Sequence, residues 1–276
     1  MSNRALIEEA FERRSQLTSA ELLALVPVIE DGLARLESGE LRAARLEEGQ
    51  WVADTFVKKL ILLSFLTREN HVGETAPWRP KSYDKLPLKF EHWDDAAFRD
   101  ARIRVVPGAV VRAGAYIAPG AVLMPCFINI GAYVGEGTMI DTWSTVGSCA
   151  QVGARCHISG GVGLGGVLEP IGNNPVVIED NVFIGARSEV AEGVIVRNGA
   201  VIGMGVYLGA STPIIDRETG DVRFGEVPAN AVVIAGNRAD PKLPGVSLAC
   251  AVIVKYVDER TRSKTSLNDL VRELSR

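Results

Sequence analysis

Four polar residues stand at positions where they could do chemistry on a small molecule. Asp141 follows an aliphatic residue at a place where neighbouring repeats have Gly or Ser, and Glu189 and His157 each directly precede an aliphatic residue. Arg104 stands just before the first repeat. A carboxylate or imidazole can hold or remove a proton, and a guanidinium pairs with anions. The structural alternatives are a turn-forming Asp and three solvated surface groups, and the residues alone leave both readings open.

Metal and phosphate templates fit the sequence poorly. Of the histidines His71, His92 and His157, only the last lies in the repeat, which excludes a trio of histidine zinc ligands there and predicts no metal site. The run GGVGLGG at 160–166 lacks the Lys-Ser/Thr of a phosphate loop, so it indicates tight corners or close approach of a ligand to the backbone. The cysteines form no CxxC pair and read as buried free thiols: Cys126, Cys149, Cys156 and Cys250.

The elements that must position these residues follow from a period of six. Large aliphatic residues recur every sixth position in four runs, and a small or turn-forming residue usually follows each. The runs are Val105 to Leu123, Ile128 to Leu164, Ile178 to Leu208, and Val227 with Val233. A period of six keeps the alternation of a strand but not the face of a helix. Three short strands per coil, with aliphatic residues inside, predict a parallel β-helix of about six coils.

Glycine content and register breaks agree with this architecture. Of the 28 glycines, 23 lie between Gly108 and Gly236, where they mark predicted bends. One residue is missing between Leu123 and Ile128, and two extra residues are expected between Leu164 and Ile178. The excursion at 210–226 contains a hairpin turn at 216–220. Insertions in such repeats form surface loops.

The flanking segments predict three parts of the chain. Residues 1–100 form a small α/β N-terminal domain with a connecting segment from 69, and a capping box at Thr18 and Glu21 opens its longest helix. Residues 101–240 form the β-helix with the hairpin loop near 210–226, and 241–276 form a C-terminal strand and helix cap. Both flanks would cover the open ends of the β-helix, whose edges are otherwise unpaired.

Composition excludes several classes of function. The net charge of −4 argues against a general nucleic-acid role, which needs a concentrated basic surface. The sequence has no run of 18 apolar residues, so no membrane span is predicted. Residues 1–14 lack the apolar core of a signal peptide, and we therefore expect a cytoplasmic protein.

Longer strings resemble one family of acyltransferases specifically. The chain carries NIGAYVGEGTMIDTWSTVGSCAQVG at 129–153, GGVGLGGVLEP at 160–170 and FIGARSEV at 183–190. Shorter matches are FERR at 11–14, LLSF at 62–65, RVVP at 104–107 and CAVIVK at 250–255. Together they span nearly the whole chain and resemble tetrahydrodipicolinate N-succinyltransferase, of the hexapeptide-repeat acyltransferases.

This resemblance implies a left-handed parallel β-helix and a homotrimer with active sites between subunits. It also implies that succinyl moves from succinyl-CoA to the amino group of L-2-amino-6-oxopimelate, the hydrated form of tetrahydrodipicolinate, in lysine and diaminopimelate biosynthesis. The amine would attack the thioester directly in a ternary complex. Succinyl-CoA is then a co-substrate, and no permanently bound cofactor is expected.

The resemblance also assigns roles to residues. Asp141 and Glu189 match the catalytic carboxylates of the family, and Arg104 matches its substrate-binding arginine. Trp143 and Gly166 lie in the matched strings and would shape the acceptor pocket together with Asp141. The expected acyl-CoA contacts are Gly185, Ala186, Gly203, Met204 and Lys255, the last with Arg260 or Arg262.

The sequence leaves two alternatives open. Another hexapeptide-repeat acyltransferase, such as an acetyl-CoA-dependent N-acetyltransferase, would share the repeat and the corners. A non-catalytic β-helical scaffold would share the fold and would tolerate loss of Asp141 or Glu189. The choice of succinyl over acetyl rests on the resemblance alone.

Overall fold

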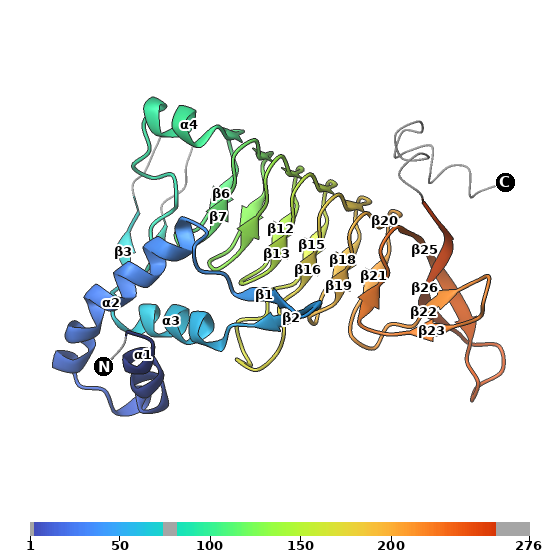
Figure 1. Ribbon diagram of the computed structural model, residues 1–276, viewed down its shortest axis with the longest axis horizontal. Coiled ribbons are helices and arrows are strands. Elements are labelled where there is room, and N and C mark those ends of the chain that lie inside the picture. The colour runs from blue at the N-terminus through green and yellow to red at the C-terminus, as the bar shows by residue number, and fades with distance from the viewer. Residues whose placement is uncertain (1–2, 74–81, 258–276) are drawn as a thin grey trace.

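The computed structural model describes residues 3–73 and 82–257, and its central part is a left-handed parallel β-helix (Figure 1). In coils without an insertion or deletion, paired residues are 18 positions apart in the sequence, as Ile140 and Ile158 are, which equals three repeats of six. Each aliphatic residue of the predicted pattern occupies the second position of a two-residue strand, except Val233, which lies in the longer strand at 231–239. The hexad therefore predicted the coils, and the mainly β fold class is confirmed.

The coils have three faces, which we number in chain order. Face 1 consists of β5 (Arg104–Val105), β8 (Val122–Leu123), β11 (Met139–Ile140), β14 (His157–Ile158), β17 (Phe183–Ile184) and β20 (Val201–Ile202). Face 2 consists of β6 (Val110–Val111), β9 (Phe127–Ile128), β12 (Thr145–Val146), β15 (Gly163–Leu164), β18 (Glu189–Val190) and β21 (Tyr207–Leu208). Face 3 consists of β7 (Tyr116–Ile117), β10 (Tyr133–Val134), β13 (Gln151–Val152), β16 (Val177–Ile178), β19 (Ile195–Val196) and β24 (Glu226–Val227).

The core of the β-helix is a column of aliphatic side chains. Ile128, Ile140, Ile158 and Ile184 are fully buried in one cluster. Smaller side chains at the bends fill the space between them, and Thr138, Ser144 and Ser188 are buried with hydroxyls that donate to backbone carbonyls of the next coil. Each buried aliphatic side chain contributes about 1.5–3 kcal/mol, so the column needs few aromatic residues.

Of the two breaks in the repeat, one has the expected number of residues and the other does not. Val111 pairs with Ile128, 17 positions on, which confirms the missing residue. Val152, however, pairs with Ile178, and no rung lies between Leu164 and Ile178. These two residues are 14 apart where the repeat needs six, so the loop adds eight residues and the expectation of two was wrong. The period of six predicts a rung near 170, where the chain instead leaves the coil.

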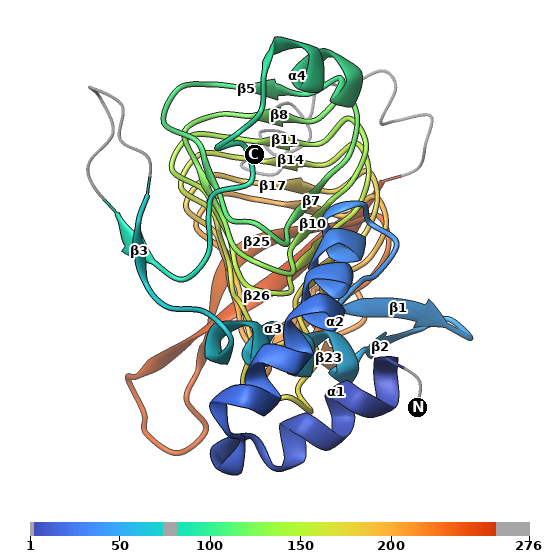
Figure 2. The same ribbon diagram turned by 90° about the vertical axis from the view of Figure 1, so that its left-hand side faces the viewer.

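The N-terminal part consists of helices and one β-hairpin. It contains α1 (Asn3–Glu12), a short 3-10 turn (Arg14–Gln16), α2 (Ser19–Glu37), the antiparallel pair β1 (Ala44–Glu47) and β2 (Gln50–Ala53), and α3 (Thr55–Leu66). The capping box at Thr18 and Glu21 is present. The core of this part includes Ile130 and Cys149 of the β-helix, and α2 passes beside β7 (Figure 2).

The connecting segment carries structure that the sequence did not predict. Strands β3 (His71–Val72) and β4 (Tyr83–Asp84) pair, and α4 (Asp95–Ala101) lies at the first coil (Figure 1). Phe90, Trp93 and Phe98 form an aromatic cluster, and Phe90 packs against the main core. This segment therefore covers the open N-terminal end of the β-helix.

A longer hairpin covers the other end. β25 (Ala231–Ala239) continues face 1 beside β20 and turns back into the antiparallel β26 (Ser247–Tyr256). Strand β22 (Ile214–Asp216) pairs with β26 and with β23 (Val222–Arg223), which confirms the hairpin expected at 216–220. The pair β25–β26 crosses position 240, and the helix expected near 267–274 lies outside the described residues.

Candidate functional site

Most of the predicted site residues lie along one edge of the β-helix, where face 1 turns into face 2. We call this edge corner 1/2. It consists of stacked tripeptides that hydrogen-bond from coil to coil: Asp141–Trp143, Ser159–Gly161, Gly185–Arg187 and Gly203–Gly205. Asp141 stands in one column with Ser159, Gly185 and Gly203, so it is the acidic member of an otherwise small and neutral row.

The carboxylate of Asp141 is half-buried and held from one side. Its Oδ1 accepts hydrogen bonds from the backbone N–H of Thr142 at 2.6 Å and from the Thr142 hydroxyl at 3.2 Å. Its Oδ2 lies 3.9 Å from Nε2 of His157, which belongs to the next coil of face 1. One oxygen is thus anchored to the corner, while the other faces an imidazole at a distance that admits a bridging group.

The remaining corner residues present backbone, apolar side chains and one cation, the exposed Arg187, whose side chain lies over Gly161. Trp143 has a φ of +63°, and its indole is 71% exposed. Met204 is 72% exposed on the same corner. At Gly185 an added Cβ would meet the backbone of Gly203 at 2.5 Å, so the row must stay without side chains there. The corner therefore offers a strip of backbone with an apolar residue at either end and the Arg187 side chain across its middle.

Glu189 lies on face 2, in the strand that follows the Gly185–Arg187 corner. Its carboxylate folds along the face over Gly163, where an added Cβ would meet Oε2 at 2.1 Å. The backbones of Asp141 and Glu189 are separated by the two coil spacings between β12 and β18, about 10 Å along the axis. The glycine lets the Glu189 carboxylate approach Asp141 by one coil.

Three predicted site residues lie away from this corner. Arg104 is exposed on the first strand of face 1, two strands before Met139. Gly166 stands at the far end of face 2, where it packs against the backbone of Gly147 and Ser148. Lys255 pairs with Val232 in the end hairpin. Within one chain, the structure brings together Asp141, Trp143, Gly185, Ala186, Gly203 and Met204, with Glu189 beside them, and does not bring Arg104, Gly166 or Lys255 to them.

The thiols of the chain are buried and poorly suited to act as nucleophiles. Burial raises the pKa of Cys126, Cys149 and Cys156 to about 12, and it also raises the pKa of Cys250. At neutral pH these groups stay protonated. Across residues 3–73 and 82–257, no three His, Cys, Asp or Glu side chains are grouped to hold a metal ion. No helix in these ranges is long and apolar enough to cross a membrane.

Two neighbours of the site are His157, which the sequence indicated only as a possible base or a surface group, and Gly163, to which the sequence assigned no role of its own. His157 is stacked on Phe183 at 5.4 Å between ring centroids and faces Asp141. Gly163 makes room for Glu189. The spacing of 18 between coils was the signal available for both. It pairs Met139, close to Asp141, with His157, and it pairs Gly163 with Glu189 once the eight residues of the loop are subtracted.

Comparison with known proteins agrees with the resemblance found in the sequence. Family models described as "Tetrahydrodipicolinate N-succinyltransferase N-terminal" and "Hexapeptide repeat of succinyl-transferase" match residues 2–67 and 175–210. The chain is 91% identical over the full length of both chains to "Protein TabB" of Pseudomonas amygdali pv. tabaci, whose name states no activity.

Relatives with a stated activity cover nearly the same length. The chain is 56% identical to the 2,3,4,5-tetrahydropyridine-2,6-dicarboxylate N-succinyltransferase of Nitrobacter hamburgensis and 57% identical to that of Zymomonas mobilis, over 97% of each chain. A solved Campylobacter jejuni structure, titled a putative 2,3,4,5-tetrahydropyridine-2-carboxylate N-succinyltransferase, shares the fold with a TM-score of 0.54 at 16% identity, over 83% of this chain and 62% of that one. This chain belongs to the tetrahydrodipicolinate N-succinyltransferase family.

Proposed function

We propose that this chain transfers succinyl from succinyl-CoA to the amino group of L-2-amino-6-oxopimelate, the hydrated form of tetrahydrodipicolinate, in lysine and diaminopimelate biosynthesis. The observation that carries this proposal is that the chain is 54–57% identical, along 97% of its length, to proteins named 2,3,4,5-tetrahydropyridine-2,6-dicarboxylate N-succinyltransferase. Two further features fit such a transfer. Asp141 is the one acidic residue in its column of the corner, and Glu189 lies beside the corner on a glycine.

The reaction needs a deprotonated amine next to a thioester. The nitrogen lone pair attacks the thioester carbonyl carbon, the new C–N bond forms, the C–S bond breaks, and CoA leaves as a thiol after taking a proton. An ammonium must first lose a proton, and a carboxylate within hydrogen-bond reach can hold the amine and receive that proton. Asp141 has one anchored and one available oxygen, which suits the holding role, and Glu189 is the proposed general base.

The acyl donor would lie along corner 1/2. The backbone at Gly185–Ala186 and Gly203–Met204 is a flat wall for the pantetheine arm, and an amide-rich arm can hydrogen-bond to such a strip. Lys255 is proposed to meet CoA phosphates from the end hairpin. The acceptor carries two carboxylates, for which Arg104 is the proposed guanidinium partner. Trp143 and Gly166 would shape the acceptor pocket.

A homotrimer with sites between subunits is part of the same proposal. Arg104 and Gly166 lie away from corner 1/2 in one chain, so a neighbouring chain would have to supply them. Large apolar side chains are also exposed on this corner and on face 2, as a buried interface would require. They are Phe127 at 38%, Trp143 at 71%, Met204 at 72% and Tyr207 at 66% exposure. We also propose a cytoplasmic location.

The test is release of free thiol from succinyl-CoA with the acceptor present. We expect turnover by the unaltered chain and a loss of kcat of about a hundredfold or more in Asp141→Asn and in Glu189→Gln, with unchanged unfolding transitions. Near-normal turnover in both variants would refute the site and favour a scaffold or another centre. Equal rates with acetyl-CoA would refute the donor assignment.

A further inference from the structure

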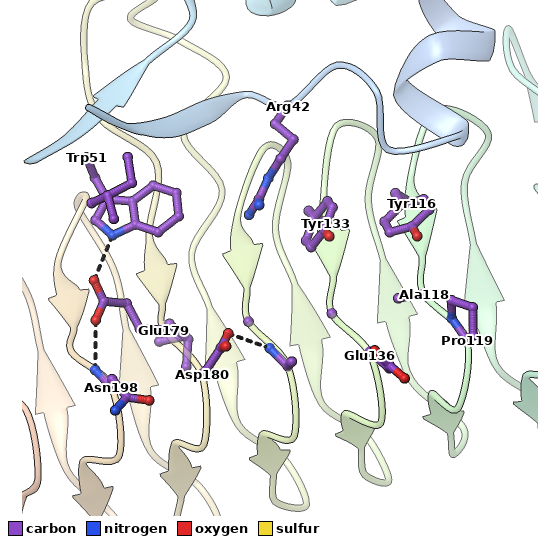
Figure 3. A pocket seen from close by; sticks show the side chains of 15 residues that line it. Arg42, Trp51, Tyr116, Ala118, Pro119, Tyr133, Glu136, Glu179, Asp180 and Asn198 are labelled. Atoms are coloured by element: carbon purple, nitrogen blue, oxygen red, sulfur yellow. Dashed lines mark hydrogen bonds between the residues drawn. The ribbon is translucent and has the colours of Figure 1, made fainter. Parts of the chain in front are cut away.

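A cavity lies under the β1–β2 hairpin, at the end of the face 1 strands opposite to corner 1/2. It has a volume of about 560 Å³, and none of the proposed acyl-transfer residues lines it. Its walls come from face 3, from the corner where face 3 turns into face 1, and from the N-terminal part of the chain (Figure 3). The transfer chemistry proposed above leaves this cavity without a role.

Arg42 is the cationic group of the cavity, and its position is fixed. Its guanidinium lies 3.7 Å from the centroid of the Tyr133 ring, and its Nε donates to Oε1 of Gln151 at 3.0 Å. Gln151 is itself buried and donates to the carbonyl of Cys149 at 2.9 Å. Both contacts hold the plane of the guanidinium, so little side-chain entropy remains to be lost when a ligand binds.

The terminal nitrogens of Arg42 point into the cavity (Figure 3). Within the part of the chain that the structure describes, neither Nη1 nor Nη2 donates a hydrogen bond to a protein acceptor. Burial lowers the pKa of this guanidinium from its ordinary value, with the nearby Tyr133, Asp180 and Tyr116 opposing the shift. A partly desolvated fork with two free N–H edges matches a carboxylate.

The opposite side of the cavity carries negative charge. Asp180 lies over Gly153, where its Oδ1 accepts from the backbone N–H of Ala154 at 2.8 Å and its Oδ2 lies 3.5 Å from Nη2 of Arg155. Glu136 is exposed at the rim. Glu179 is already committed, because it accepts from Trp51 Nε1 and Arg197 at 2.9 Å each and from the N–H of Asn198 at 2.8 Å. A ligand cation can therefore approach Glu136 and the Oδ2 of Asp180, whose contact with the exposed Arg155 is long.

Aromatic rings join the two charged ends. Tyr116 and Tyr133 are stacked at 4.8 Å between centroids, and Trp51 is fixed by its bond to Glu179. Gly135 and Gly153 keep the floor free of side chains, since a Cβ at Gly135 would meet the backbone of Gly153 at 2.4 Å. The space between Arg42 and the carboxylates is thus lined by rings and bare backbone, which suits an apolar chain.

We propose that this cavity binds a small amino-acid zwitterion, whose carboxylate pairs with Arg42 and whose ammonium faces Asp180 and Glu136. A simple anion would be repelled by the carboxylates and a simple amine by Arg42, so both charges are needed on one molecule. Binding here is separate from acyl transfer, because the cavity shares no residue with corner 1/2.

The test is calorimetric titration of the full chain with three probes of one length: 5-aminopentanoate, pentanoate and pentylamine. We expect 5-aminopentanoate to bind at least about tenfold more tightly than either single-charge probe, as expected from one charge-assisted contact. Absence of binding by 5-aminopentanoate, or equal binding of pentanoate, would overturn the proposal.

Variants separate the two ends of the site. Arg42→Gln should weaken 5-aminopentanoate about tenfold to a hundredfold, and Arg42→Lys should restore only part of that loss because the fork is missing. Glu136 is exposed, so Glu136→Gln should fold normally and weaken 5-aminopentanoate without weakening pentanoate. The exposed Glu69→Gln makes the same charge change outside the cavity and should change neither. Unaltered binding in both Arg42→Gln and Glu136→Gln would overturn the proposal, and unfolding transitions confirm that each variant is folded.

Discussion

At the scale of residues, the proposed chemistry depends on small neighbours as much as on the carboxylates. Asp141 is anchored by Thr142 through one oxygen, and Glu189 occupies the space above a glycine. A residue with no functional group of its own, Gly163, thereby determines where the proposed base lies. This dependence gives a test that leaves both carboxylates in place.

Gly163→Ala should lower kcat strongly while changing the thermal unfolding midpoint little. The added Cβ would meet the Glu189 carboxylate at 2.1 Å, and that carboxylate is the far end of a flexible side chain that can turn away at small cost. Gly172→Ala is the matched control, because a Cβ there meets nothing within 4 Å. Kinetics and unfolding of both variants check this. Full activity in Gly163→Ala would show that the position of the Glu189 carboxylate over Gly163 does not matter for turnover.

At the scale of elements, each coil is held by its inward aliphatic residue and each helix by its cap. Ile140 is fully buried in the central column, and Val222 on the β22–β23 hairpin is 46% exposed. We expect Ile140→Ala to lower the free energy of unfolding by about 2–5 kcal/mol, because the stacked coils cannot close the cavity. Val222→Ala should change it far less. Denaturant unfolding measures both, and equal effects would contradict a core of stacked aliphatic residues.

The capping box of α2 predicts a specific loss of stability in acid. Hydrogen bonds from the backbone and side chain of Thr18, together with Arg13, lower the pKa of Glu21 from 4.5 to about 2. A depressed folded pKa adds stability that is present above 4.5 and is lost as pH falls toward 2. Glu21→Gln should therefore be less stable than the unaltered chain at pH 6, and the difference should shrink between pH 4.5 and 2. A difference independent of pH would show that the carboxylate charge is not what stabilises the cap.

The sequence predicted elements wherever one local rule decided the outcome. The period of six placed the aliphatic residue of each short strand, and Thr18 marked the start of α2. The prediction was wrong at 165–176, because the period of six places a strand where the structure has a loop. The sequence also did not predict the structure at 82–101, because α4 and the Phe90 cluster depend on contact with the first coil. The candidate corner was predictable because its residues share one register. The cavity around Arg42 was not, because it joins parts of the chain that are far apart in sequence, as the contact between Arg42 and Gln151 is across 109 positions.

At the scale of the whole molecule, the proposal requires a trimer. One chain leaves Arg104 and Gly166 apart from corner 1/2 and exposes Phe127 and Tyr207 on face 2. Light scattering should give three times the chain mass of 29.6 kDa. Phe127→Glu should shift the protein toward monomer and lower turnover, whereas Leu23→Glu, on the 73% exposed Leu23 of α2, should do neither. A fully active monomer would contradict sites shared between subunits.

The most direct measurement of the central claim is the identity of the product. The purified chain is given tetrahydrodipicolinate with equal amounts of succinyl-CoA and acetyl-CoA, and the product is identified by mass spectrometry. Our account predicts that the acceptor gains a succinyl group on its amine, in an amount equal to the thiol released, with little acetylated product. Predominant acetylation, or thiol release without a modified acceptor, would contradict it.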